Sequence, residues 1–251
     1  MILGDTVHAQ YKKPPITEAV ISIVFKKLTG EEDLLDLQKK FSKYYPHSQA
    51  IENVHVKLNI GTLPNTNMGQ TRERGYRLSS LDMTEILVLF PKSITVSQLA
   101  PYPGWDSFFA RFRRDWAFRK RKLNFQTVER IGVRYINRVD IPMEGEAVAH
   151  EDYLNIFPRV PSELAPLNAY TVQVQRLMRD INALLTINSA SVPSPLLKHA
   201  SFIIDQDIVR QIDVPQRDED IFGLINEIRV RKNKIFESCV TDHARGLFRH
   251  G

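Results

Sequence analysis

Residues 128–142 read VERIGVRYINRVDIP, and this stretch decides the fold class. Its side chains alternate between two faces, and one face carries Arg130, Arg134 and Arg138. The other face is apolar and consists of Ile131, Val133, Tyr135, Val139 and Ile141. Because alternation of this kind is typical of a strand with one face in a core, we expect an antiparallel sheet.

Long helices are expected before and after this strand in the sequence. Residues 104–122 (GWDSFFARFRRDWAFRKRK) place aromatic side chains on one helical stripe, and residues 218–239 repeat apolar residues at helical spacing. Shorter helices are expected at 31–45 and 151–157. Further strands are expected at 18–28, 53–60, 76–81, 85–90, 93–99, 170–178, 183–188 and 200–210. The chain is therefore predicted to be α+β, with antiparallel sheet packed on long amphipathic helices.

The order of strand, helix, several strands and long helix occurs twice along the chain. Corresponding elements are separated by about 110 residues. We expect a tandem duplication of a β-α-β(3-4)-α unit, with halves at 1–125 and 126–251, in one continuous sheet or in two related sheets. The alternative is a coincidence of element order.

Composition sets broad limits. In 251 residues, 43% are hydrophobic and 25% are charged, as in ordinary globular chains. The lone cysteine, Cys239, excludes an internal disulfide and favours a reducing, cytoplasmic location. The N-terminus does not resemble a secretory signal, and the apolar runs are too short to cross a membrane. The oligomeric state is not set by the sequence.

A cluster of basic residues follows the aromatic stripe of the helix at 104–122. Its seven cations are Arg111, Arg113, Arg114, Arg119, Lys120, Arg121 and Lys122. They could bind the phosphates of a nucleic acid, although the whole chain carries a net charge of only +5. The alternative is a solvated helix face behind aromatic side chains that pack in the core.

The arginine row of residues 128–142 is a second candidate site. Arg130, Arg134 and Arg138 are spaced about 13 Å apart along an extended strand. Guanidinium groups could hold the phosphates or carboxylates of a ligand, or they could pair with acids on neighbouring strands. Glu18, early in the first strand, is expected to pair with one of them. Asn137 lies in the apolar register and is expected to hydrogen-bond within the core.

Sequence motifs for common enzymes are missing. The chain has no GxGxxG or GxxxxGK loop, no HExxH pair and no GxSxG turn. We therefore predict no catalytic residue, cofactor or metal, and we expect Cys239 to pack as a small hydrophobic residue.

Three segments together resemble one family of sporadically distributed, uncharacterised prokaryotic proteins of about this length. They are PPITEAV at 14–20, RIGVRYINR at 130–138 and FESCVTD at 236–242. The resemblance implies no activity, but the patchy distribution suggests genes of phage defence or of toxin–antitoxin pairs. Arg229 stands where the resemblance predicts a histidine.

These observations favour a non-catalytic binding or regulatory module that recognises another protein. Nucleic-acid binding through the basic helix is the alternative, and an enzyme acting on a phosphorylated ligand is the third hypothesis.

Overall fold

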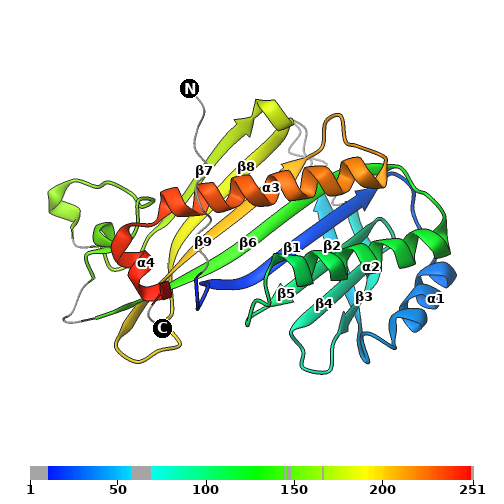
Figure 1. The fold of residues 1–251 in the computed structure, drawn as a ribbon, viewed down its shortest axis with the longest axis horizontal. Coiled ribbons are helices and arrows are strands. Elements are labelled where there is room, and N and C mark those ends of the chain that lie inside the picture. The colour runs from blue at the N-terminus through cyan, green and yellow to red at the C-terminus, as the bar shows by residue number, and fades with distance from the viewer. Residues whose placement is uncertain (1–10, 58–68, 144, 146–147, 166, 250–251) are drawn as a thin grey trace. The chain divides into compact units, whose positions relative to one another are not determined.

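A computed structural model describes residues 11–57, 69–143, 145, 148–165 and 167–249. Among these residues, nine strands form one antiparallel sheet in the order β2-β3-β4-β5-β1-β6-β9-β8-β7 (Figure 1). The strands are β1 (Ile16–Phe25), β2 (His47–Lys57), β3 (Gly69–Ser79), β4 (Glu85–Phe90), β5 (Ser93–Leu99), β6 (Val128–Pro142), β7 (Thr171–Met178), β8 (Ala183–Val192) and β9 (His199–Arg210). The helices are α1 (Glu31–Phe41), α2 (Trp105–Leu123), α3 (Asp218–Cys239) and α4 (Asp242–Arg249). The predicted α+β class and antiparallel sheet are confirmed.

The chain divides into two compact units, and each unit combines segments that are separated in the sequence. Unit 1 contains residues up to Ala19, Ala100–Tyr102 and everything from Gly132 onward, and unit 2 contains Val20–Leu99 and Pro103–Ile131. The central strands β1 and β6 therefore each contribute to both units. The halves at 1–125 and 126–251 stay a prediction, because they describe a repeat along the chain and not a cluster in space.

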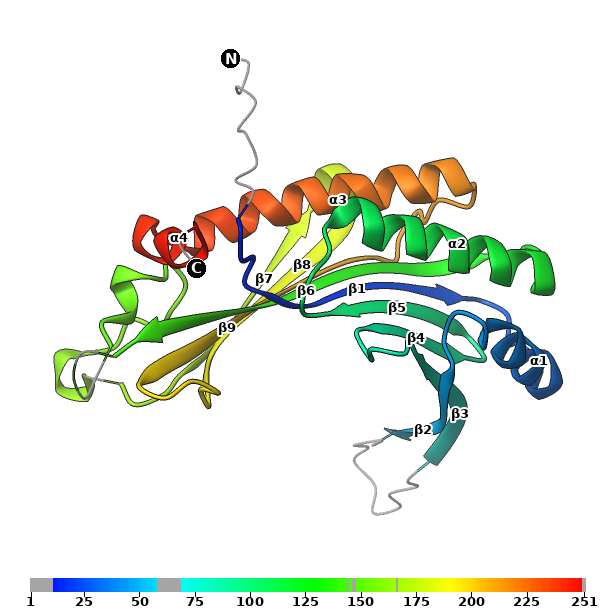
Figure 2. The same cartoon turned by 60° about the horizontal axis from the view of Figure 1, so that its bottom comes forward.

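Unit 1 has its core between α3 and the inner faces of its strands. Helix α3 begins with three acids, Asp218, Glu219 and Asp220, which suit the positive end of the helix dipole. It then buries a stripe of residues at helical spacing and lies along β9 (Figure 2). Among the fully buried members of this core are Tyr135, Val139, Ile204, Ile208, Ile221 and Ile228. Each buried aliphatic side chain contributes about 1.5–3 kcal/mol to folding.

Unit 2 is built in a similar way around α2. Phe108, Phe112 and Trp116 of this helix are buried, and the ring of Trp116 stacks on Phe25 of β1. The shorter helix α1 buries Leu34, Leu37 and Phe41. Three polar residues, Arg111, Asp115 and Arg119, also lie on the buried stripe of α2. Charged groups in the core require hydrogen-bonding or ionic partners, so α2 contributes polar as well as apolar contacts to the core.

Gly75 allows two neighbouring strands of unit 2 to approach closely. A Cβ atom at this position would lie 2.5 Å from the carbonyl oxygen of Leu89 and 2.5 Å from the Phe90 ring. Glycine in β3 therefore leaves room for a buried phenylalanine of β4.

The structure differs from the sequence-based expectations after β6. Residues 151–157 were expected to form a helix, but only a 3₁₀ turn at His150–Asp152 occurs there. Leu154 instead forms a β-bridge with Val240, and Thr241 N–H donates to Tyr153 O at 3.0 Å. These backbone bonds compete with helix formation, and the same bridge separates α3 from α4. The strand expected at 53–60 lies within β2 as far as Lys57, and residues 58–60 lie outside the described ranges.

Candidate functional site

The arginine row of β6 is part of a network of polar side chains across the sheet of unit 1. Arg134 Nε and Nη2 donate to Asp205 Oδ1 and Oδ2, each at 2.7 Å. Asn188 Nδ2 donates to Asp205 Oδ2 at 3.2 Å, and Gln173 Nε2 donates to Asn188 Oδ1 at 2.8 Å. The network of hydrogen bonds thus extends over β6, β9, β8 and β7. Two nitrogen atoms of the Arg134 guanidinium bind a carboxylate of the same chain.

The other members of the row have different environments. Arg138 Nε donates to Asp140 Oδ1 at 2.9 Å, and Ser201 Oγ donates to the same oxygen at 2.5 Å. Arg130 is partly buried. Arg134 therefore pairs with an acid of the neighbouring strand β9, whereas Arg138 pairs with an acid of its own strand.

Glu18 acts on Arg134 through its charge. The hydrogen bond to Asp205 raises the pKa of Arg134, and the charges of Asp207 and Glu18 raise it further. The expected pairing of Glu18 with one of the three arginines stays a prediction, and the charge effect on Arg134 is consistent with it.

The cations of α2 divide into buried and exposed groups. Arg111 is 6% exposed, and its Nη2 donates to Ser97 O at 2.7 Å and to Gln98 Oε1 at 3.2 Å. Its Nη1 donates to Tyr45 Oη at 3.3 Å. Tyr45 in turn donates to Asp115, whose carboxylate also accepts a bond from Arg114 Nε at 2.9 Å. Arg111 and Arg114 therefore belong to a buried polar network.

Asp115 is the acid of this network. Burial raises the pKa of Asp115, although hydrogen bonds from Arg114 and Tyr45 and the charge of Arg111 oppose that shift. Burial also raises the pKa of the Tyr45 hydroxyl, so Tyr45 remains a donor. The network joins α2 to β5 and, through Tyr45, to the segment that follows α1.

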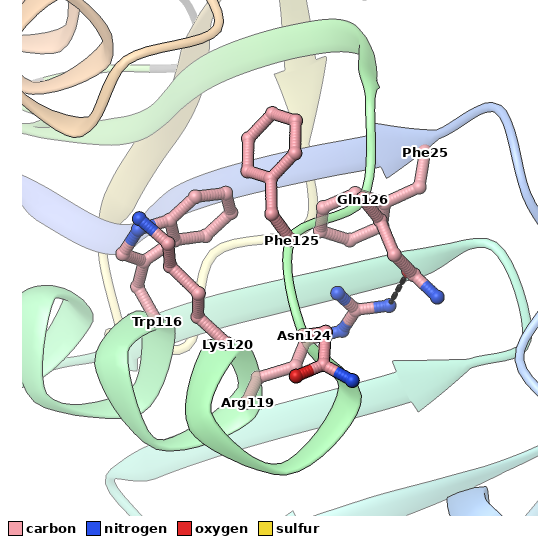
Figure 3. Close-up of a pocket in the computed structure, with 7 residues that line it drawn as sticks. All are labelled: Phe25, Trp116, Arg119, Lys120, Asn124, Phe125 and Gln126. Carbon is pink, nitrogen blue, oxygen red and sulfur yellow. Dashed lines mark hydrogen bonds between the residues drawn. The ribbon is translucent and has the colours of Figure 1, made fainter.

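The remaining cations of α2 differ in their exposure and in their partners. Lys122 forms an ion pair with Asp36 of α1. Arg119 is buried and donates from Nη2 to Gln126 Oε1 at 2.7 Å, as Figure 3 shows. Arg113 and Arg121 are exposed, and Lys120 is partly exposed. Nucleic-acid binding stays a prediction, and the exposed members of the predicted set are Arg113 and Arg121.

Lys232 is a buried amine that the sequence analysis did not single out. It is 5% exposed, and its Nζ lies 3.5 Å from the centroid of the Tyr135 ring. Burial, and then the charge of Arg229, lower the pKa of Lys232 to about 7, whereas Glu237 opposes this shift. The signal in the sequence was its position four residues from both Ile228 and Phe236 on the apolar stripe of α3.

Other polar groups lie near Lys232. The hydroxyls of Tyr135 and Tyr102 are 3.1 Å apart, and burial raises the pKa of Tyr135 well above its ordinary value. Asn137, also inward as expected, donates from Nδ2 to Ile204 O at 3.1 Å. Gln206 lies on β9, and both polar atoms of its side-chain amide are buried without a hydrogen bond to the described residues. The core of unit 1 therefore contains several polar side chains among its apolar ones.

Strand β7 exposes two large apolar side chains among polar ones. Val174 is 44% exposed and Leu177 is 57% exposed, and the register pairs Leu177 with Leu184 of β8, which is 41% exposed. Val174 and Leu177 project to opposite faces because they are an odd number of residues apart. Strand β7 ends the sheet, so its outer edge pairs with no strand in the described part of the chain.

The described residues contain no group of three or more His, Cys, Asp or Glu side chains that could hold a metal. Cys239 is buried, and burial raises its thiol pKa to about 11. No helix in the described ranges has the length and apolar character needed to cross a membrane.

Comparison with known proteins gives no identity. No protein-family model matches the chain, and no curated protein has a significantly similar sequence.

Proposed function

We propose that the chain is a non-catalytic binding or regulatory module that recognises another protein along the outer edge of β7. The observation that carries this proposal is the exposure of apolar side chains on both faces of a terminal strand. An edge strand presents backbone N–H and C=O groups that can pair with an added strand. Apolar side chains above and below this edge would supply the burial that stabilises such a pair.

The opposite end of the sheet provides a contrast. Strand β2 is also terminal, but its exposed residues include His47, Ser48, Gln49 and Glu52, which are polar. Natural proteins protect edges with polar and charged side chains, and β7 has a single charged residue, Arg176. Among the side chains that the structure describes on these two terminal strands, large exposed apolar ones therefore occur on β7.

The expected partner is an extended segment of another protein with alternating apolar residues. Apolar side chains on both of its faces would cover Val174 and Leu177, and an acid near Arg176 would provide charge complementarity. The resemblance to sporadically distributed prokaryotic proteins favours a partner encoded by a neighbouring gene. Neither of the polar clusters described above is required for this function.

The test is co-expression of the chain with the products of its neighbouring genes. Wild-type protein should copurify with one of them, and Leu177→Lys should reduce the recovered partner at least about tenfold, because it places a charge in the paired interface. Leu164→Lys is the matched control, since Leu164 is similarly exposed at 62% but lies away from β7 in a 3₁₀ turn. Equal recovery with both variants would contradict the proposal.

Two other outcomes are informative. If β7 pairs with a second copy of the chain, Leu177→Lys would convert a dimer into a monomer without any partner, and the hetero-partner proposal would be wrong. If the protein instead binds oligonucleotides with a steep salt dependence that Arg113→Glu and Arg121→Glu abolish, the alternative of nucleic-acid binding would be favoured.

We also propose that the fold arose by tandem duplication. In the first half, the sheet order outward from the centre is β1-β5-β4-β3-β2, and in the second half it is β6-β9-β8-β7. In each half, the first strand neighbours the last one, and a long helix follows that last strand. This shared order supports a repeat in which the second half lacks one strand and has 3₁₀ turns in place of the first helix.

A further inference from the structure

A ladder of polar side chains crosses the sheet of unit 1 and ends at the outer strand β7. This polar ladder begins at Arg134 of β6, which binds Asp205 of β9, and continues through Asn188 of β8 to Gln173 of β7. The register places Asn188 directly across from both of its partners. The residue after Arg134, Tyr135, contacts α3, so the polar ladder lies on the face of the sheet that is turned away from this helix.

Asp205 fixes the direction of the hydrogen bonds in the polar ladder. A carboxylate bound by arginine can only accept, so Asn188 must turn its amide nitrogen towards it, and Nδ2 donates to Asp205 Oδ2 at 3.2 Å. The amide oxygen of Asn188 then faces β7, where it accepts from Gln173 Nε2 at 2.8 Å. Gln173 therefore uses its donor within the chain, and its carbonyl oxygen, Oε1, is the group left at the end of the polar ladder.

A second pair of side chains on the same face has the same direction. Gln175 lies two residues from Gln173, and its Nε2 group donates to Thr186 Oγ1 of β8 at 3.3 Å. In the described part of the chain, the Oε1 atoms of both glutamines accept no hydrogen bond. Both side chains are exposed. One face of the outer strand thus presents two amide oxygens as acceptors.

The backbone groups of the same two residues point to the outer edge of the sheet. Ser191 N–H donates to Tyr170 O at 3.0 Å, so the pair of residues just before β7 is hydrogen-bonded to β8. Because hydrogen-bonded and non-hydrogen-bonded pairs alternate between antiparallel strands, the N–H and C=O groups of Gln173 and Gln175 face outward. An added antiparallel strand would bind these groups, and the side chains directly opposite them would lie on the face of the polar ladder.

The side chains opposite the two glutamines would meet the two amide oxygens. Lysine and arginine carry donors and no acceptor, whereas ionised glutamate and aspartate carry acceptors alone. Asp205 and Asp207 add negative charge on the same face, which Arg134 offsets in part. The whole chain has a net charge of +5, so its overall electrostatic attraction favours an acidic partner instead. A preference for lysine at these positions would therefore have a local cause.

We propose that the polar ladder selects, among strands that add to β7, those with lysine or arginine opposite Gln173 and Gln175. This inference rests on the proposed function of β7 and narrows the class of partner. Addition of the strand itself depends on backbone hydrogen bonds and apolar contacts, and the polar ladder sets the preference between side chains. An antiparallel partner would read apolar, acidic, basic, apolar, basic opposite Leu177, Arg176, Gln175, Val174 and Gln173.

Two synthetic peptides that differ only at the two basic positions test the inference. Both contain Val-Glu-Xaa-Val-Xaa between threonine residues, with lysine at both variable positions in one peptide and glutamate in the other. The lysine peptide should bind the full chain about tenfold more tightly in calorimetric titrations, because its ammonium groups donate to the free amide oxygens. Equal affinities, tighter binding of the glutamate peptide, or no binding of the lysine peptide would overturn the inference.

Asn188→Leu tests whether the polar ladder or charge alone causes the preference. This variant removes the middle of the polar ladder without changing any charge, and residue 188 lies on β8, away from the added strand. Gln173 can then turn its amide either way, so the preference for lysine should fall to about threefold or less. Asn226→Leu, on α3, is the matched control and should keep the preference. An unchanged preference in Asn188→Leu would assign it to charge and overturn the inference.

Thr186→Val repeats this test at Gln175 if Asn188→Leu does not fold, because it removes the acceptor of the Gln175 amide. The result is separate from the test of the proposed function. If Leu177→Lys reduces the recovery of the partner but both peptides bind equally, β7 is a docking edge and the selection by the polar ladder is wrong. If Leu177→Lys changes neither partner recovery nor peptide binding, the proposed function of β7 is itself wrong.

Discussion

At the scale of single residues, Lys232 and Arg111 show how charge is accommodated in the two cores. Lys232 lies over the Tyr135 ring and has no carboxylate at hydrogen-bonding distance in the described chain, whereas Arg111 donates to three acceptors. The amine can lose its proton near neutral pH, but a guanidinium cannot. We therefore expect the two residues to respond differently to substitution.

Lys232 should make stability depend on pH. Its pKa is lowered from 10.5 to about 7 in the folded chain, so between these values the unfolded chain binds a proton that the folded chain does not. The free energy of unfolding should consequently rise from pH 7 towards pH 10. Lys232→Met should flatten this rise and should stabilise the protein by about 1–3 kcal/mol at pH 8, measured by urea unfolding.

Lys234→Met is the control for that experiment, because Lys234 is exposed on the same helix. The nearby charges of Arg229 and Glu237 are retained in both variants. If Lys232→Met and Lys234→Met have the same pH profile, then Lys232 is not the group that titrates.

Arg111 should instead be required for stability at every pH between 5 and 9. Arg111→Met leaves the Gln98 amide and the Ser97 carbonyl without their donor and removes a charge near buried Asp115. We expect a loss of about 3 kcal/mol in urea unfolding. Arg121→Met should cost less than about 0.5 kcal/mol, since that residue is exposed. A similar loss for both variants would contradict a structural role specific to Arg111.

At the scale of elements, the bond between β6 and β9 should provide measurable coupling. The side chain of Arg134 is 47% exposed and that of Asp205 is 8% exposed, so the pair is only partly screened by water. Asp205→Asn should cost about 1–2 kcal/mol because it weakens bonds from both Arg134 and Asn188. A double-mutant cycle with Arg134→Met should give a coupling energy of about 1 kcal/mol. If the losses of stability in the two single variants add up to the loss in the double variant, the hydrogen bonds between Arg134 and Asp205 do not contribute measurably to stability.

Elements with strong periodicity were the most predictable. The alternation of residues 128–142 predicted β6, and the apolar stripe of residues 218–239 predicted α3. Both patterns are strong because burial of one face dominates the folding energetics of these elements. Residues 151–157 were mispredicted, because the β-bridge between Leu154 and Val240 joins residues far apart in the chain. The secondary-structure preference of a short segment carries no information about such a long-range contact.

The candidate sites were less predictable than the elements. Arg111, Asp115 and Arg119 share the helical spacing of the buried aromatics, but their charge favoured an exposed position. Their burial depends on Tyr45, Gln98 and Gln126, which other elements bring to α2. Lys232 was overlooked for the same reason, since a lysine on an apolar stripe is ordinarily expected to reach water.

At the scale of the whole molecule, the sheet order makes folding depend on distant parts of the chain. Strand β1 lies between β5 and β6, and Thr17 Oγ1 donates to Ile136 O while Thr95 Oγ1 donates to Ser22 Oγ. A sheet whose first strand is central has many contacts between residues far apart in sequence, which slows folding.

The position of β1 has a consequence during synthesis. Its neighbour β5 begins at Ser93 and its other neighbour β6 begins at Val128. At bacterial and eukaryotic translation rates, roughly 5–20 s separate the synthesis of β1 from that of β6. For that time the nascent chain carries an apolar strand with at least one unpaired edge, so a growing polypeptide that stalls before β6 should be a substrate for chaperones and proteases.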